Sequence, residues 1–290
     1  MKTYMQLLRV HHYLKNGLIF LPLLFSGNLF QVQLLIETLV GYISFCLIAS
    51  SIYIYNDIQD IEKDKLHPLK KNRPIASGKI SKKKAIGIGC VVFFLALLIQ
   101  LGGYLYFQNV GFLYATMIML IYFVMNLFYS RGLKNIPIID VMILAFGFVL
   151  RVLYGGALTD TEISSWLFLT VLSICMFAGF GKRRNEMIKN KTQSRKVLQE
   201  YTKNFLDKSM YLFLSLALVF YSLWCTNGFR FIETNLLTYS VLFVIFIVLK
   251  YALTIEQDSY GDPIDVILKD KTLMIVSVIY MIYMVVAIYA

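Results

Sequence analysis

Three aspartates at a regular spacing are the residues of this chain best suited to chemistry. The segment from Asn56 to Asp64 reads NDIQDIEKD, so its aspartates are separated by three and then by four residues. On a helix, side chains at these separations lie on one face, and Asn56 lies one turn before Asp60 on that face. The spacing therefore predicts that three carboxylates and one amide converge.

A group of converging carboxylates suggests a bound cation. Like charges on neighbouring helical turns repel each other, and a hard divalent cation relieves that repulsion. Mg²⁺ typically binds through one or two carboxylates together with substrate phosphates, so the pattern predicts a site for Mg²⁺ and a diphosphate. The alternative is a solvated acidic helix end, neutralised by Lys63, Lys65 and the lysines beyond. The predicted metal ligands are Asn56, Asp57, Asp60 and Asp64, and the three aspartates are also the predicted catalytic residues.

The elements that must position these residues lie in a membrane. Of the 290 residues, 58% are hydrophobic and 16% are charged, and the mean hydropathy is +0.67, whereas about a quarter of the residues in soluble domains are charged. This composition excludes a water-soluble enzyme. Apolar runs recur along the whole chain, so we predict an all-α polytopic membrane protein with one transmembrane domain over residues 1–290.

Nine transmembrane helices around a central cavity are predicted. The run from Gly17 to Phe25 is too short to span a membrane alone, so the first span must include Lys15 and Asn16, which then face the protein interior. The long polar loops near residues 56–84 and 182–208 follow the second and sixth spans. The predicted spans lie near residues 9–27, 34–55, 85–104, 110–129, 136–157, 163–181, 208–228, 235–253 and 272–290.

The basic residues predict the orientation of these spans. The net charge is +11, and with the N-terminus inside, every Lys and Arg lies on the inner side except Arg151, within a span, and Arg230, outside. Inner loops of membrane proteins are enriched in Lys and Arg. We therefore expect a multi-pass protein of the cytoplasmic membrane, with a cytoplasmic N-terminus and active site and an outer C-terminus. Membrane lipids, rather than nucleic acid, are the expected partners of this charge.

The aspartate segment resembles a known family. Its pattern, N-D-x-x-D-x-x-x-D between the second and third of nine helices, is similar to the first aspartate-rich motif of the UbiA superfamily of intramembrane prenyltransferases. The continuation from Asp64 to Gly78, D-x-x-H-P-x-K-x-x-R-P-I-A-S-G, resembles the decaprenyl-phosphate phosphoribosyltransferase branch. Segments YSRGLK at 129–134, GFVLR at 147–151 and GKRR at 181–184 support that branch. The resemblance covers essentially the whole chain and implies a UbiA-type fold.

One segment departs from the superfamily pattern. Prenyl-diphosphate enzymes of the superfamily usually carry a second D-x-x-x-D motif after the sixth helix, where this chain has Lys182, Arg183 and Arg184. Three cations in that place suit substrates with more negative charge than a prenyl diphosphate and an aromatic acceptor carry. Phosphoribosyl diphosphate and a lipid phosphate are such a pair. Each cation taken alone is explained equally well as an anchor on the inner side of the membrane.

Other residues are predicted to bind substrate. Asp140 and Arg151 lie about three turns apart in one span and share nearly the same face, and ionisable groups at membrane depth are functional candidates. The alternatives are that Asp140 caps the helix or pairs with Lys134, and that Arg151 makes a structural hydrogen bond or ion pair. Tyr129 and Lys134 border a short inner loop, where both side chains can bind phosphate. The predicted substrate-binding residues are Lys15, Asn16, His67, Lys70, Arg73, Tyr129, Lys134, Asp140, Arg151, Lys182, Arg183, Arg184 and Glu186.

Three functions fit these features. The first is Mg²⁺-dependent transfer of a 5-phosphoribosyl group from 5-phosphoribosyl 1-diphosphate to a polyprenyl phosphate, with release of diphosphate. The acceptor phosphate is already anionic, so this reaction requires no general base. The second is transfer of a prenyl group from a polyprenyl diphosphate to an aromatic or other small acceptor, although the usual second aspartate motif is missing. The third is transport of an anionic metabolite or lipid phosphate, although carriers place their binding groups nearer the membrane midplane.

Overall fold

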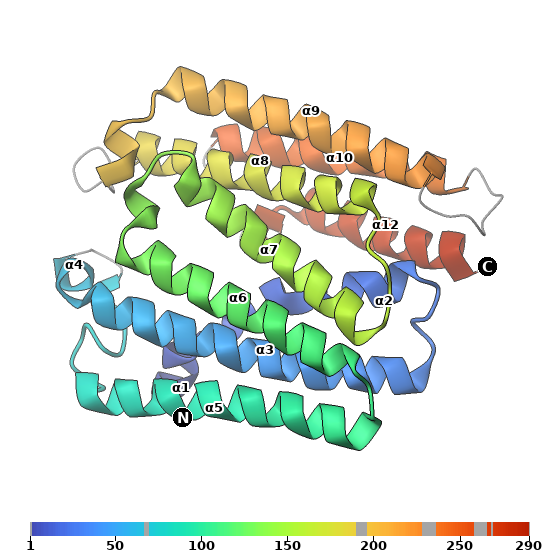
Figure 1. Cartoon of the computed structure of the whole chain (residues 1–290). Helices are drawn as coiled ribbons and strands as arrows, with labels where there is room; N and C mark the ends of the chain where they lie inside the picture. Colours follow the sequence, from blue (N-terminus) through green and yellow to red (C-terminus); the bar gives the residue numbers. More distant parts are fainter. Residues whose placement is uncertain are drawn as a thin grey trace. The chain divides into compact units, whose positions relative to one another are not determined.

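The computed structural model describes residues 2–66, 70–189, 196–227, 236–257, 266–267 and 269–289, and within these ranges the protein consists of helices joined by turns and short loops. Eight helices within these ranges are long and apolar enough to cross a membrane (Figure 1). The prediction of an all-α polytopic membrane protein is therefore confirmed. The long helices are α3 (Val32–Gln59), α5 (Lys82–Phe107), α6 (Gly111–Arg131), α7 (Ile139–Leu158), α8 (Ser165–Lys189), α9 (Lys203–Asn227), α10 (Leu236–Gln257) and α12 (Lys271–Tyr289).

The N-terminal segment differs from the predicted first span. After the short helix α1 (Lys2–Leu7), the chain forms a 3₁₀ helix, η1 (Val10–Phe20), and then the short helix α2 (Leu21–Phe25). A 3₁₀ helix of this length is uncommon. Side chains of α3 bind this segment, because the Tyr42 hydroxyl donates to the Tyr13 carbonyl in η1 at 3.1 Å and the Ser50 hydroxyl donates to the carbonyl of Leu8, just before η1, at 2.8 Å. Among the described residues, the number of long apolar helices is thus eight rather than nine.

The aspartate segment lies on two helices rather than on one helical face. Helix α3 ends at Gln59, Asp60 caps it, and the short helix α4 (Ile61–Leu66) follows. The Asp60 N–H still donates to the Asn56 carbonyl at 3.0 Å, and the Asp64 N–H donates to the Asp60 carbonyl at 2.8 Å. The chain therefore bends at Asp60 without losing these bonds. The predicted loop at 56–84 also contains the 3₁₀ turn η2 (Lys70–Asn72).

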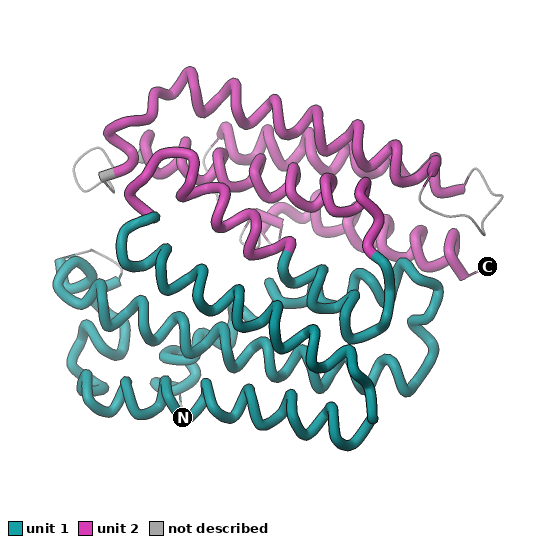
Figure 2. Tube along the Cα trace, in the orientation of Figure 1, with its two compact units in different colours: residues 1–133, 150–162 teal, residues 134–149, 163–290 magenta. Residues whose placement is uncertain are grey.

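Two compact units divide the chain. Unit 1 comprises residues 1–133 and 150–162, and unit 2 comprises residues 134–149 and 163–290 (Figure 2). Helix α7 contributes its first half to unit 2 and its second half to unit 1. Unit 1 carries the whole aspartate segment, whereas unit 2 carries the basic segment at 182–184. The single transmembrane domain predicted over residues 1–290 stays a prediction.

The core of unit 1 forms around α3. Phe45, Ile48 and Ile52 of α3 are at most 1% exposed and belong to one apolar cluster with Ala96 of α5 and Met119 of α6. Apolar burial adds little between helices in lipid, so close packing and interhelical hydrogen bonds must hold such helices together. The Ser44 hydroxyl supplies one such bond by donating to the Ala96 carbonyl at 2.9 Å.

A glycine permits the closest approach of α7 to the N-terminal segment. A Cβ at Gly155 would collide with the backbone carbonyl of Ile19 in η1. Any larger residue at position 155 would therefore push η1 away from α7. Small residues serve the same purpose at many helix contacts in membranes.

In unit 2, α8 packs along α9, and α10 packs along α12 (Figure 1). Helix α8 continues to Lys189, so the basic segment at 182–184 is helical and does not lie in the predicted loop at 182–208. Asp270 caps α12, because its carboxylate accepts from the backbone N–H groups of Thr272 and Leu273 at 3.0 and 3.1 Å. Lys250 of α10 pairs with the same carboxylate at 3.2 Å, which ties α10 to the start of α12.

Candidate active site

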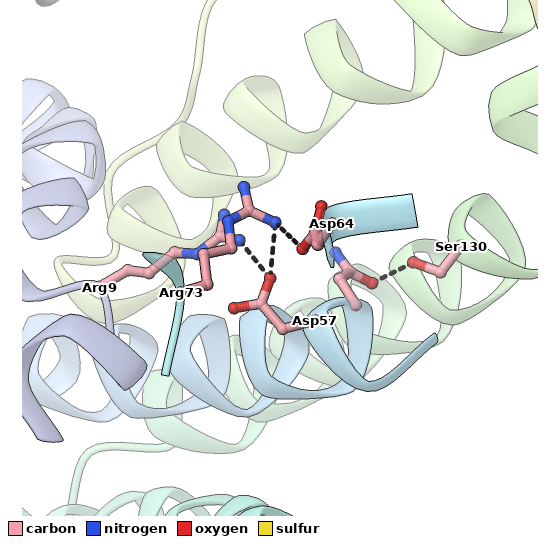
Figure 3. A network of polar contacts seen from close by, with 6 residues as sticks. Arg9, Asp57, Asp64, Arg73 and Ser130 are labelled. Atoms are coloured by element: carbon pink, nitrogen blue, oxygen red, sulfur yellow. Dashed lines mark hydrogen bonds and ion pairs between the residues drawn. The ribbon is translucent and has the colours of Figure 1, made fainter. Parts of the chain in front are cut away.

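Two of the three aspartates converge on one arginine. The guanidinium of Arg73 contacts Asp57 at 3.0 Å and Asp64 at 2.6 Å (Figure 3). Both aspartates are only 3% exposed. Asp57 comes from the last turns of α3 and Asp64 from α4, so the bend at Asp60 still leaves the two carboxylates facing the same group. A buried carboxylate is unstable without a cation or hydrogen-bond donors nearby, and Arg73 supplies both.

Arg9 is a second cation of this cluster. Its Nη2 lies 2.5 Å from Asp57 Oδ1, the same oxygen that Arg73 contacts (Figure 3). The guanidinium also lies over the ring of Tyr53, 4.9 Å from its centre. The sequence analysis missed Arg9 because 48 residues separate it from Asp57. The sequence feature that could have indicated Arg9 is its position shortly before the short N-terminal apolar run.

The chemistry of this cluster fits a divalent cation, although its present arrangement is built around arginines. Oxygen ligands from two buried carboxylates are the type of ligand that Mg²⁺ takes, usually with substrate phosphates completing its shell. Within the described ranges, no group of three or more acidic, His or Cys side chains is assembled closely enough to hold a metal ion. Asp60, half-buried at the bend, therefore does not yet join Asp57 and Asp64 in such a group.

Asn56, the fourth predicted metal ligand, is bonded within unit 1. Its side-chain oxygen accepts from the hydroxyl of Ser130 near the end of α6 (Figure 3). Ser130 also donates to the Asn126 carbonyl at 2.9 Å. The bond between Ser130 and Asn56 joins the end of α3 to the end of α6. Asn56 thus lies beside the acidic cluster, and its oxygen must exchange Ser130 for a metal to become a ligand.

The remaining predicted residues of unit 1 differ in burial. Tyr129 is buried on α6, while Lys15 in η1 and Lys70 in η2 are half-buried. His67 lies outside the described residues. Burial alone does not test whether these residues bind substrate, so their binding to substrate stays a prediction.

Asn16 and Arg151 meet in the core of unit 1. Arg151 Nε donates to Asn16 Oδ1 at 2.8 Å, and Arg151 Nη2 donates to the Tyr122 hydroxyl at 2.9 Å. The guanidinium also lies over the rings of Phe45 and Tyr122. Asn16 in turn donates to Cys46 Sγ at 3.1 Å. These contacts agree with the structural alternative for Arg151, and substrate binding by either residue stays a prediction.

Unit 2 holds a second buried ionic cluster. Arg183 of α8 lies 2.5 Å from Asp140 of α7, and both residues are at most 1% exposed. Arg183 also contacts Glu186 at 2.9 Å. The Tyr201 hydroxyl donates to the other oxygen of Asp140 at 2.7 Å. The Asp140 carboxylate is thus bonded to Arg183 and Tyr201, partners that the sequence analysis missed.

Tyr201 also stabilises an unusual turn. Its hydroxyl accepts from the backbone N–H of Ile138 at 2.5 Å, and Ile138 has a φ of 67°, which is strained for a β-branched residue. Burial raises the pKa of Tyr201, and the Asp140 carboxylate raises it further although the Ile138 N–H acts in the opposite direction. Tyr201 therefore remains protonated at neutral pH and keeps donating to Asp140.

The other two predicted cations of α8 differ from Arg183. Arg184 pairs with Asp207 of α9, whose side chain is 31% exposed. Lys182 is half-buried, as is Lys134 near the start of unit 2. Arg183 and Arg184 are thus each bonded to carboxylates of unit 2. Their predicted contact with phosphate stays a prediction.

Comparisons with known proteins agree on one family. Residues 18–288 match the model of the UbiA prenyltransferase family. A decaprenyl-phosphate phosphoribosyltransferase of Corynebacterium glutamicum is 29% identical over 97% of this chain and 85% of its own length. The enzyme of the same name from Mycolicibacterium smegmatis is 31% identical over 81% of this chain and 75% of its own length.

A solved structure supports the fold. A UbiA homologue from Archaeoglobus fulgidus, bound to DMAPP and Mg²⁺, superposes with a TM-score of 0.73 over 99% of each chain at 18% identity. At this identity the likeness concerns the fold alone. The predicted UbiA-type fold is thereby confirmed.

Proposed function

Because the chain belongs to the UbiA prenyltransferase family and is an integral, multi-pass membrane protein, we propose that it is a polyprenyl-phosphate phosphoribosyltransferase. It transfers a 5-phosphoribosyl group from 5-phosphoribosyl 1-diphosphate to a polyprenyl phosphate and releases diphosphate. The observation that carries this choice of substrates is the similarity to decaprenyl-phosphate phosphoribosyltransferases over nearly the whole chain.

The reaction exchanges one bond to the sugar for another. An oxygen of the lipid phosphate forms a bond to C1 of the ribose, and the bond from C1 to the diphosphate breaks. The diphosphate leaves with the electron pair, and no proton has to move. The acceptor is already an anion, so the protein must mainly orient two anionic substrates and neutralise their charge.

The residues of unit 1 supply the donor site in this proposal. Asp57 and Asp64 hold the metal ion, and Asp60 and Asn56 complete its protein ligands. Bound Mg²⁺ neutralises charge on the leaving diphosphate. Lys70 and Arg73, which follow the acidic segment directly, bind phosphate oxygens. Arg73 already contacts both buried carboxylates, which supports its role in binding a diphosphate held by a metal ion beside them.

The site is proposed to face the cytoplasm. The segment from Asn56 to Lys84 is rich in basic residues, which remain on the inner side of a membrane. A sugar diphosphate is water-soluble and highly charged, so it must reach the site from the aqueous side. The lipid tail of the acceptor then leaves sideways between helices into the bilayer.

A diphosphate-release assay tests the function. The purified protein in detergent receives phosphoribosyl diphosphate with and without a polyprenyl phosphate and Mg²⁺, and we expect release only when both are present. Release from a polyprenyl diphosphate, and none from phosphoribosyl diphosphate with acceptors of several tail lengths, would contradict the proposal in favour of a prenyltransferase.

A pair of variants on one short helix tests the site itself. Asp64→Asn is expected to lower kcat by roughly 10² or more, the cost of removing one group that stabilises charge in a transition state. Glu62→Gln is the matched control, because Glu62 is on the same helix but exposed, where it pairs with Lys65. Equal activity of the two variants would remove Asp64 from the proposed site.

A further inference from the structure

One face of α3 holds the N-terminal segment along several turns. Positions 42, 46, 50, 53 and 57 are separated by three or four residues and so share a face of the helix. Each carries a side chain that contacts the segment. The contacts join Tyr42 to the Tyr13 carbonyl, Cys46 to Asn16, Ser50 to the Leu8 carbonyl and the Tyr13 hydroxyl, Tyr53 to Arg9 and His12, and Asp57 to Arg9.

Arg9 is placed by this row of contacts. Its backbone adopts the left-handed conformation, with φ 51° and ψ 48°, between α1 and the start of η1. The Ser50 bond fixes the carbonyl of Leu8, the residue before it, at 2.8 Å. The side chain of Arg9 is 16% exposed and ends on Asp57 Oδ1. The N-terminal segment therefore places a guanidinium on a buried carboxylate.

The two arginines and two buried aspartates of this cluster balance in charge. Arg9 and Arg73 both contact Asp57 Oδ1, and Arg73 also contacts Asp64 (Figure 3). A divalent ion that entered alone would meet two guanidinium groups within a few ångströms and would leave the cluster with an excess of two positive charges. A diphosphate brings the negative charge that offsets this excess and gives the displaced arginines new partners.

From this geometry we infer that Arg9 is a positioning residue that makes binding of the metal ion depend on the diphosphate. Without ligands, Arg9 holds Asp57 in place and competes with the ion for its oxygen. With a diphosphate present, the competition weakens, so ion and diphosphate bind together. The inference rests on the metal and diphosphate site of the proposed function. Because such coupling is reciprocal, the ion must strengthen diphosphate binding by the same factor.

Metal binding measures this coupling directly. Protein-bound Mn²⁺ is determined by electron paramagnetic resonance on purified protein in detergent, at matched concentrations of free Mn²⁺, with and without inorganic diphosphate. In the unmodified protein, diphosphate is expected to raise the Mn²⁺ affinity by about fivefold or more. In Arg9→Gln, the affinity without diphosphate is expected to rise, and the gain caused by diphosphate is expected to shrink by about the same factor.

Two further variants control the experiment. Arg131→Gln removes the same charge from the end of α6 in unit 1, but Arg131 is exposed and bonds the Tyr55 hydroxyl, so the coupling is expected to stay as in the unmodified protein. Ser50→Ala leaves every charge in place and removes the bonds to the Leu8 carbonyl and the Tyr13 hydroxyl. It is expected to change Mn²⁺ binding in the same direction as Arg9→Gln, by a smaller factor.

The outcomes separate this inference from the proposed function. If folded Arg9→Gln binds Mn²⁺ as the unmodified protein does, with and without diphosphate, the inference is wrong. If Arg9→Gln does not fold, unchanged binding in Ser50→Ala overturns it instead. Inorganic diphosphate is released by either kind of transferase, so coupling without turnover of phosphoribosyl diphosphate would contradict only the proposed donor. Turnover without coupling would contradict only the inference.

Discussion

Buried carboxylates in both units are bonded to arginines. In unit 2, the Asp140–Arg183 pair and the Asp207–Arg184 pair differ in exposure. Asp140 and Arg183 are fully enclosed, whereas Asp207, the partner of Arg184, is 31% exposed. Removing one member of a buried pair leaves an uncompensated charge and is strongly destabilising. A pair that water reaches from one side contributes less, because water and salt screen it.

Asp140→Asn is therefore expected to destabilise the protein strongly. The free energy of unfolding is expected to fall by roughly 3 kcal/mol, because Arg183 keeps only its contact with the Glu186 carboxylate and Tyr201 loses a charged acceptor. The measurement is the thermal unfolding midpoint in detergent. Asp207→Asn is the matched control in the same unit, and its expected loss is smaller, because water reaches the Asp207 carboxylate.

The same variant separates the two interpretations of Asp140. A structural role predicts a lower unfolding midpoint with KM for both substrates unchanged at a temperature where the variant is folded. A direct contact with substrate predicts a changed KM and an unchanged midpoint. The second result would contradict the structural role that the Arg183 and Tyr201 contacts indicate.

At the scale of the element, α12 depends on a cap at its first turn. Asp270 accepts from two backbone N–H groups of that turn and pairs with Lys250. Burial would raise the pKa of Asp270, but the Leu273 N–H and the Lys250 ammonium outweigh it and lower the pKa below its ordinary value. Its stabilisation is therefore complete above the unfolded pKa of about 3.9 and is lost as the pH falls through the lower folded pKa.

Asp270→Ala is expected to lower the free energy of unfolding by about 1 kcal/mol, the usual contribution of such a cap. The thermal midpoint in detergent at neutral pH measures it. Lys269→Ala, one residue earlier and exposed, changes a neighbouring side chain without touching the cap. A loss that is equal in the two variants would show that the effect does not come from the cap.

At the scale of the whole molecule, the basic residues predict which ends of the helices face the cytoplasm. Lys83, in the first turn of α5, lies on the proposed inner side near the aspartate segment in the sequence. Glu162, between α7 and α8, lies on the proposed outer side. Both side chains are exposed, so a cysteine at either position is accessible to a reagent in water.

Cysteine labelling in intact cells tests this orientation. In a background with the exposed Cys90 changed to Ser, a membrane-impermeant maleimide is expected to label Glu162→Cys at once. It is expected to label Lys83→Cys only after the membrane is opened. The reverse pattern would invert the topology and place the aspartate segment outside, away from a cytoplasmic sugar diphosphate.

Features that depend on composition and local spacing were predictable from the amino-acid sequence. They include the all-α membrane fold, most of the spans and the convergence of Asp57 with Asp64, while the resemblance of the aspartate motif to a known family indicated the family. Apolar length decides whether a helix can cross a bilayer. The spacing predicted convergence on one helical face, whereas in the structure Asp57 and Asp64 come from two helices and both contact Arg73. The bend at Asp60 leaves Asp60 itself outside the group, while Asp57 and Asp64 still converge.

Pairings between distant residues required the folded molecule. Arg9 is 48 residues from Asp57, Arg183 is 43 residues from Asp140, and Arg151 is 135 residues from Asn16. Local pattern carries no information about such pairs, because they form only when packed helices bring their backbones together. The N-terminal 3₁₀ helix has the same origin. The Tyr42 hydroxyl of α3 donates to the Tyr13 carbonyl within this helix, and the Ser50 hydroxyl donates to the Leu8 carbonyl just before it, so contacts with α3 hold the segment that places Arg9 on Asp57.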